Sequence, residues 1–398
     1  MTEGELRFTA APGVTLPTVS MTADAVSIGI HTTNVTMRSI FTLDGVRFSA
    51  TGCDFYANGF NDGNHYITSG ETYTLDPELL CNEVRLVNGA VLDVWKFYEN
   101  NYGSGQYMRP SVFMTNATLR AKSELWFSNA RSAKANVHLN AKSTYRVSDS
   151  ALEGPLALSG GVDGDFANTY LGPIDHTAAG TMKFSNTGFG TLLFRDGSVF
   201  RVSTFDLSAF DTRYTLTFAF DGAEWQYGAG DYTFSPALPA GMSEFFAFES
   251  RGKGLILKPA EGTTFTAAYP IGGTGGLIVD GPGTVKFNAG TLAFTGTAVV
   301  RQGTLDAGGQ AVTIRLQPGE TVPMLKDCAA KGKILVDMGG VVCEKGATFA
   351  VARISGSTPL RFKAVNFADP ELYGYFTVQD GLVSMTVGDK PGLAIIVR

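Results

Sequence analysis

The chain has 398 residues and a formal net charge of −6, and only 17 % of its residues are charged, below the roughly 25 % of an average globular protein. Helical bundles need Glu, Lys and Arg on their solvent-facing sides, so this low charge and the 48 glycines argue against a helical protein. The acidic balance and the lack of a Lys/Arg stripe argue against a nucleic-acid partner.

Short segments in which apolar and polar residues alternate recur along the chain. Residues 46–48, 84–86, 214–220 and 312–316 are examples. Alternation with a period of two residues is typical of β-strands, in which one face packs and the other meets solvent. We therefore expect an all-β fold.

A small turn of Asn, Asp, Gly or Ala precedes many of these strands. It occurs at Asp44-Gly45 and begins at Asn88, Asn116 and Asn140. Asn and Gly adopt positive φ at little cost, which lets a chain turn sharply between strands. The intervals from Asn88 to Asn116 and on to Asn140 are 28 and 24 residues, which predicts one coil of a solenoid between turns. An antiparallel β-sandwich or barrel is the alternative.

The composition changes near residue 320, where the Gly-rich turn phrase gives way to longer apolar segments. We predict that residues 1–320 form the solenoid, with loop excursions around residues 53–110. Residues 321–398 are predicted to form a C-terminal β unit. The last coil of a solenoid exposes unpaired strand edges, so we expect this unit to cap the open end.

Residues 275–307 read GGLIVDGPGTVKFNAGTLAFTGTAVVRQGTLDA. The phrases Gly275-Gly276-Leu277, Gly283-Thr284-Val285 and Gly303-Thr304-Leu305 resemble the autotransporter-associated β-strand repeat of bacterial surface proteins. Asp280 departs from the Lys or Thr usual in that repeat. The resemblance implies a right-handed parallel β-helix, export to the cell surface or the medium, and a scaffold role without enzymatic activity.

Other features bear on location and redox state. Met1 is followed by Thr-Glu-Gly-Glu rather than by a basic and then apolar leader, which indicates a fragment or a mature chain. No apolar run approaches the roughly 20 residues of a membrane-spanning helix. We expect an extracellular or cell-surface protein. Free thiols are favoured for the four cysteines, and the bridges to test are Cys53–Cys81 and Cys328–Cys343.

The sequence predicts no catalytic residue, no metal site and no cofactor. None of the four histidines has a partner at metal-ligand spacing, and no G-x-S-x-G phrase occurs. A polysaccharide hydrolase needs two carboxylates across one glycosidic bond, whereas Asp163-Gly164-Asp165 is an isolated acidic pair in a Gly-rich loop. Its role as a calcium ligand is the less favoured interpretation.

Aromatic residues crowd two stretches that also contain Asn and Gly. Rings beside amides on loops suit stacking on sugar faces, so we name five candidate carbohydrate-binding residues: Trp95, Tyr98, Tyr102, Tyr107 and Tyr56. The alternative is that these rings pack over a long loop excursion.

The functional expectation is a non-enzymatic cell-surface or secreted scaffold, similar to an adhesin, that presents loops to glycans or to host or cell-surface molecules. A carbohydrate-binding or polysaccharide-cleaving β-helix is the alternative.

Overall fold

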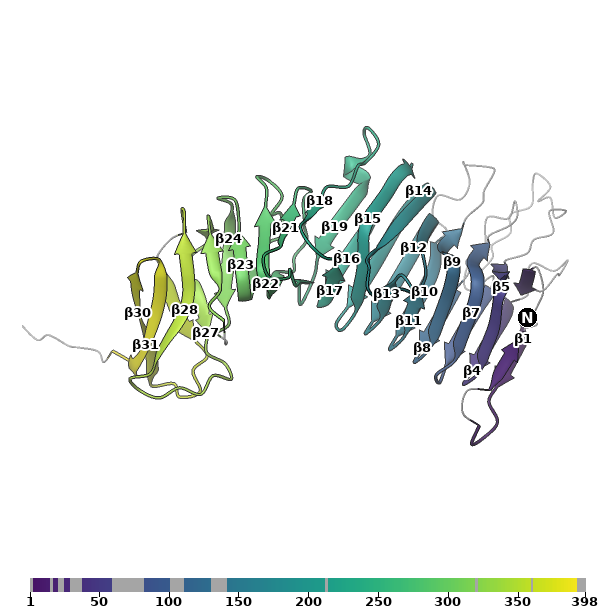
Figure 1. The fold of residues 1–398 in the computed structure, drawn as a ribbon, viewed down its shortest axis with the longest axis horizontal. Helices are drawn as coiled ribbons and strands as arrows, with labels where there is room; N and C mark the ends of the chain where they lie inside the picture. The colour runs from purple at the N-terminus through teal and green to yellow at the C-terminus, as the bar shows by residue number, and fades with distance from the viewer. Residues whose placement is uncertain are drawn as a thin grey trace, which may run out of the picture. The chain divides into compact units, whose positions relative to one another are not determined.

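The computed structural model describes residues 3–14, 17–20, 25–28, 38–58, 82–100, 111–129, 142–211, 214–318, 321–358 and 361–391 (Figure 1). Within them lie 31 β-strands and one 3-10 helix, Ser243–Phe245. The chain divides into two compact units. The first contains residues 1–228 and 236–247, and the second contains residues 229–235 and 248–398.

The first unit is a stack of coils in which each strand pairs in parallel with the equivalent strand of the next coil. One ladder runs β1–β4–β6–β8–β10–β12–β14–β16, and a second runs β2–β5–β7–β9–β11–β13–β15–β17. The strands are β1 (Glu3–Thr9), β2 (Thr18–Ser20), β3 (Ala25–Ile28), β4 (Arg38–Asp44), β5 (Arg47–Asn58), β6 (Asn82–Val87), β7 (Val91–Asn100), β8 (Ser111–Thr115), β9 (Thr118–Asn129), β10 (Lys142–Ser148), β11 (Ala151–Glu153), β12 (Leu156–Ala167), β13 (Tyr170–Gly172), β14 (Gly180–Arg195), β15 (Val199–Phe210), β16 (Leu216–Asp221) and β17 (Ala223–Gln226).

A third face is formed by the far ends of the long strands. β5, β7 and β9 each bend at a shift of register, and beyond the bend β5 pairs with both β3 and β7. A β-bulge of this kind kinks a strand and turns it onto a new face. Each coil therefore has three sides around one interior, which is the architecture of a parallel β-helix.

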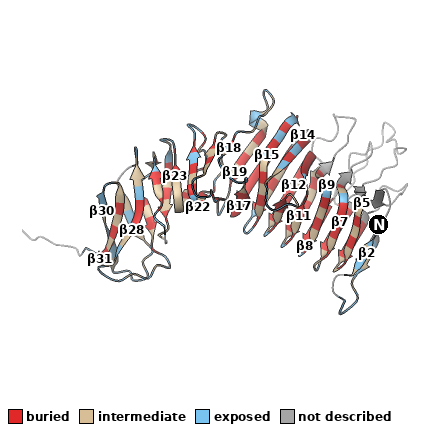
Figure 2. Ribbon diagram, in the orientation of Figure 1, coloured by how far each residue is buried: buried red, intermediate tan, exposed pale blue. Residues whose placement is uncertain are grey.

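Apolar side chains fill that interior in rows that run from coil to coil. Along many strands, buried residues alternate with intermediate ones and with a few exposed ones (Figure 2). Phe194 stacks on Phe166 at 5.3 Å and on Phe220 at 5.1 Å between ring centroids. Stacked rings in register exclude water along the axis and favour one alignment of neighbouring coils. The row to which they belong is Leu43, Leu86, Met114, Val147, Phe166, Phe194 and Phe220.

The second unit continues with parallel pairing and ends in antiparallel strands. β23 pairs in parallel with β24 and β25, and β27 pairs in parallel with β29. The strands wholly within this unit are β18 (Tyr232–Phe234), β20 (Leu255–Leu257), β21 (Thr264–Ala267), β22 (Leu277–Phe287), β23 (Thr297–Asp306), β24 (Ala311–Leu316), β25 (Met324–Lys326), β26 (Ala329–Ala330), β27 (Ile334–Asp337), β28 (Thr348–Ser355), β29 (Phe362–Val365), β30 (Leu372–Gln379) and β31 (Leu382–Asp389); β19 (Phe246–Ser250) spans the division between the units.

The C-terminal cap is a hairpin of β30 and β31 that pairs antiparallel with β28. Asp380 and Gly381 form its turn, with φ of 50° and 74°. Positive φ at both central residues gives the turn a twist that matches the flanking strands. The predicted parallel β-helix with a small C-terminal β cap is confirmed. Parallel pairing extends past residue 320 to β29, and the separate unit predicted for residues 321–398 stays a prediction.

Candidate functional site

The aromatic residues predicted to bind carbohydrate lie on strands wherever the structure describes them. Tyr56 belongs to β5, Trp95 and Tyr98 belong to β7, and the backbones of Tyr56 and Tyr98 are register partners. Tyr102 and Tyr107 lie outside the described residues, as does much of the stretch 53–110 that was expected to form loops.

The Trp95 side chain faces solvent and is 44 % exposed. Trp95 lies where the register with β9 shifts between Val94 and Lys96, and a bulge turns a side chain outward. A carbohydrate-binding role for the five aromatic residues stays a prediction.

The turns between the two main ladders form one corner of the first unit. Asn88, Asn116, Asp149 and Asn168 occupy equivalent places there, with φ of 57°, 49°, 48° and 48°. Asn and Asp tolerate this left-handed conformation better than most residues. The predicted turns at Asn88 and Asn116 are thus confirmed. The corner after Asn116 is Asp149 rather than Asn140, because the intervening coil has 33 residues.

Hydroxyl groups join the coils just inside this corner. Thr169 Oγ1 donates to the carbonyls of Val147 (3.1 Å) and Ala167 (2.9 Å), and Ser198 Oγ accepts from the Thr169 N–H at 3.2 Å. Ser150 Oγ accepts from the Ala117 N–H at 3.1 Å. These bonds satisfy buried backbone groups and hold the corner residues at fixed positions in successive coils.

Amide and carboxylate side chains stand outside the same corner. Asn88 donates to Asp44 at 2.7 Å, and Asn168 donates to Asp149 at 2.6 Å. The Arg7 guanidinium also donates a hydrogen bond to Asp44. The bonds from Asn88 and Arg7 together hold the pKa of Asp44 below its usual range. Asn116 stands between the two bonded pairs, and its amide bonds to no side chain among the described residues.

An ion-pair row lies on the outward face of the second ladder, next to this corner. Asp93, Arg120 and Glu153 are register partners in successive coils. The Arg120 guanidinium lies 3.4 Å from the Asp93 carboxylate and 2.6 Å from Glu153. The hydrogen bond to Glu153 raises the pKa of Arg120 despite the opposing effect of burial. Glu153 also lies 3.5 Å from His176 Nε2.

Tyr170 and His176 stack at 4.4 Å with nearly parallel rings. The Tyr170 hydroxyl donates to the carbonyl of Pro173 at 2.9 Å, and the Arg201 guanidinium lies 5.4 Å from the ring centre. A Cβ on Gly172 would lie 2.9 Å from the Tyr170 hydroxyl, so the glycine leaves room for the phenol. Burial raises the pKa of Tyr170 above its usual value.

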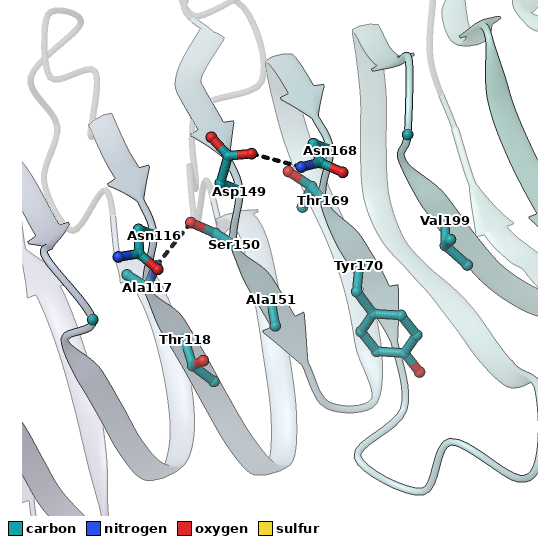
Figure 3. Close-up of a pocket in the computed structure, with 12 residues that line it drawn as sticks. Asn116, Ala117, Thr118, Asp149, Ser150, Ala151, Asn168, Thr169, Tyr170 and Val199 are labelled. Carbon is teal, nitrogen blue, oxygen red and sulfur yellow. Dashed lines mark hydrogen bonds between the residues drawn. The ribbon is translucent and has the colours of Figure 1, made fainter.

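A groove of about 470 Å³ runs across five successive coils beside the corner residues. Its floor is one register row on the outward face, formed by Thr118, Ala151, Tyr170 and Val199. Figure 3 shows Asn116, Asp149 and Asn168 along one side and the Tyr170 ring pointing away from that side. The described residues that line it are Gly89, Asn116, Ala117, Thr118, Asp149, Ser150, Ala151, Asn168, Thr169, Tyr170, Gly197 and Val199.

The groove offers hydrogen-bond donors and acceptors on a rigid support, and it was not identified from the sequence. Asn116 is recognisable there as a turn residue, but Asp149 and Asn168 follow at intervals of 33 and 19 residues. A recurrent Asn or Asp at the start of each strand was the available signal. Unequal coil lengths hid which of these residues lie side by side.

Two other predicted features have simple outcomes. Asp163 and Asp165 both lie on β12, and each forms an ion pair, with Arg146 at 3.3 Å and with Arg195 at 2.6 Å. The thiols of Cys328 and Cys343 are free, whereas Cys81 lies outside the described residues. In the described ranges no three His, Cys, Asp or Glu side chains gather as metal ligands.

No family model, curated protein or solved structure matches this chain. Across the described ranges, no helix has both the length and the apolar character needed to cross a bilayer. The structural evidence on function therefore consists of the parallel β-helix, the corner residues with the hydroxyl bonds that join them from coil to coil, and the groove beside this corner.

Proposed function

We propose that this chain is a non-enzymatic β-helical scaffold, exposed at the bacterial cell surface or secreted, that presents its outer face to a partner. The observation that carries this proposal is that hydrogen bonds from Ser and Thr hydroxyls link one coil to the next along the corner. Thr169 bonds to two backbone carbonyls, and Ser198 in turn bonds to the Phe166 carbonyl at 2.8 Å. The same pattern of turn and hydroxyl therefore repeats across neighbouring coils.

Such a ladder supports a scaffold role for a physical reason. Each coil of a solenoid contacts its neighbours, so its stability is a sum of coil and interface terms, and the outer face stays free for recognition. Interactions that lock the relative register of coils keep outer side chains at a fixed spacing of about 4.8 Å. A surface of this kind is preorganised for an extended partner.

The outward carboxylates also favour recognition over hydrolysis. Asp93 and Glu153 share Arg120, and hydrolysis of a glycosidic bond requires one carboxylic acid that donates a proton. A carboxylate in an ion pair with arginine is ionised, so it offers charge and accepts hydrogen bonds but has no proton to donate to the glycosidic oxygen.

Surface labelling of the organism that encodes the chain tests the location. Intact cells are treated with a membrane-impermeant amine-reactive biotin reagent, and the chain is then isolated with an antibody. We expect biotin on the chain, or the chain itself in the medium, under conditions in which a cytoplasmic control protein stays unlabelled. Labelling that requires cell lysis would contradict the proposal.

A further inference from the structure

We infer that the groove beside the Asn116 corner binds a linear, neutral polysaccharide that lies across the coils. The inference rests on the proposed scaffold role, since it names the partner of the outer face. It places binding at residues different from the aromatic set predicted from the sequence.

The dimensions of the groove fit an extended chain. Its lining runs from Gly89 to Val199 across five coils, and four steps of about 4.8 Å give a length of about 19 Å. The repeat of an extended glycan is close to the spacing of the coils. Successive sugars can therefore meet equivalent side chains in successive coils.

The polar groups of the groove suit hydroxyls. Asn116 supplies both a donor and an acceptor, because its amide bonds to no other side chain in the described residues. Asp149 accepts the bond from Asn168 through Oδ1, and no side chain in the described part of the chain donates to Oδ2. Thr118 on the floor adds a hydroxyl. A sugar hydroxyl donates and accepts at once, so it can bridge Asn116 and Asp149.

The floor supplies an apolar contact of matching shape. Ala151 lies at its centre, in register with Thr118 on one side and Tyr170 on the other. Small side chains between larger neighbours leave a shallow depression in which the C–H face of a sugar can rest.

Charge selects a neutral ligand. Asp149 is the one charged residue among those that line the groove, and it forms no ion pair with the described residues. A polysaccharide of uronic acids or sulfated sugars would bring negative charge against this carboxylate. An extended peptide fits less well, because the groove lies on the face of a sheet whose backbone groups already pair between coils.

Titration calorimetry on the full chain tests the inference with cellohexaose, xylohexaose and mannohexaose as neutral probes and hexagalacturonate as the anionic probe. We expect binding of at least one neutral hexasaccharide and none of hexagalacturonate. Failure of all three neutral probes with folded protein would overturn the assignment, as would preferential binding of hexagalacturonate.

Variants locate the site. Asn116→Gly keeps a residue suited to positive φ but removes the amide, and we expect about tenfold weaker binding. Ala151→Trp fills the floor and should abolish binding. Asn88→Gly is the matched control, since Asn88 has the same corner conformation but does not line the groove. It should bind as the wild type does.

The outcomes separate this inference from the proposed function. Wild-type affinity in both Asn116→Gly and Ala151→Trp, with folding verified by circular dichroism, would place any sugar binding elsewhere and overturn the groove assignment. If the chain is labelled on intact cells but binds no neutral hexasaccharide, the proposed scaffold role stands and the assignment of the groove as a polysaccharide site is overturned. If the chain binds the probe through Asn116 but is labelled only after lysis, the groove assignment stands and the proposed surface location is overturned.

Discussion

The side-chain amide of Asn168 donates a 2.6 Å hydrogen bond to the carboxylate of Asp149, which lies one coil earlier at the same corner. Both residues have φ of 48°. The bond therefore joins two residues of uncommon backbone conformation in neighbouring coils, and it contributes to the alignment of these coils.

Substitution of Asn168 separates the backbone and side-chain contributions of this corner. Asn168→Gly removes the hydrogen bond, and we expect a loss of about 1 kcal/mol in the free energy of unfolding. Asn168→Ala also removes the bond but, unlike Asn168→Gly, keeps a Cβ in the left-handed region, so we expect it to be about 1–2 kcal/mol less stable than Asn168→Gly. Urea unfolding followed by circular dichroism measures both losses. Equal stability of the two variants would show that the conformation carries no strain.

Removal of the Arg120 guanidinium tests the ion-pair row. Arg120→Met takes away the cation that Asp93 and Glu153 share, and each of these two side chains is only 8 % exposed, although Asp93 keeps its ion pair with Arg47 at 2.5 Å. Because two poorly solvated charges lose a counterion, we expect a loss of about 2–3 kcal/mol at neutral pH.

The matched control for this prediction is Arg146→Met. Arg146 pairs with Asp163 at 3.3 Å, and both side chains are more than 40 % exposed. An exposed pair of this kind contributes little, so the variant should stay within about 0.5 kcal/mol of the wild type. A similar loss in both variants would mean that burial of the carboxylates does not matter here.

The thiol of Cys328 occupies a place in the second unit that hydroxyls fill in the first. Its Sγ lies 3.3 Å from the Lys326 carbonyl and 3.4 Å from the Leu305 carbonyl, and burial raises its pKa to about 12. The thiolate is the reactive form, so a variant that keeps Cys328 as its one cysteine should react with Ellman's reagent at pH 8 only as fast as the protein unfolds. We also expect Cys328→Ser to stay within about 1 kcal/mol of the wild type. Rapid modification of the native variant would contradict the buried position.

Asp337 should make stability depend on acid. Burial raises the pKa of this carboxyl, but bonds from the Asn366 amide and the Gly339 N–H and the charge of Arg315 outweigh it, so the pKa is lowered. A lowered pKa in the folded state contributes stability that is present above the unfolded pKa of about 3.9 and is lost as pH falls through the folded value.

Urea unfolding between pH 2 and pH 5 checks this sign. The wild-type free energy of unfolding should fall as the pH is lowered, and Asp337→Asn should show a shallower dependence. An identical pH profile for the two proteins would remove Asp337 from the acid response.

Local sequence patterns predicted the coil architecture because the corner has strong chemical requirements. Asn88 and Asn116 occupy the turns that precede β7 and β9, where φ is positive, and few residue types tolerate that conformation. Asp380-Gly381 is an equally strong hairpin signal, with two residues of positive φ between β30 and β31. This dipeptide lies where the antiparallel pairing of the cap begins.

The groove could not be predicted in the same way. Ser150 and Ala117 are 33 residues apart, whereas Asn168 and Asp149 are 19 apart, although each pair joins neighbouring coils. A fixed period cannot assign partners when excursions of different length separate the strands. The sequence likewise contains no sign that Gly172 makes room for the Tyr170 hydroxyl.

The sequence by itself determined the strands, the turns and the all-β class, because alternation and positive φ are properties of a few consecutive residues. Only the tertiary structure decided which corners are neighbours, which charges share Arg120 and where a groove opens. Those relationships arise from parallel pairing between residues far apart in the chain, and the register of that pairing depends on the packing of a whole coil on the next.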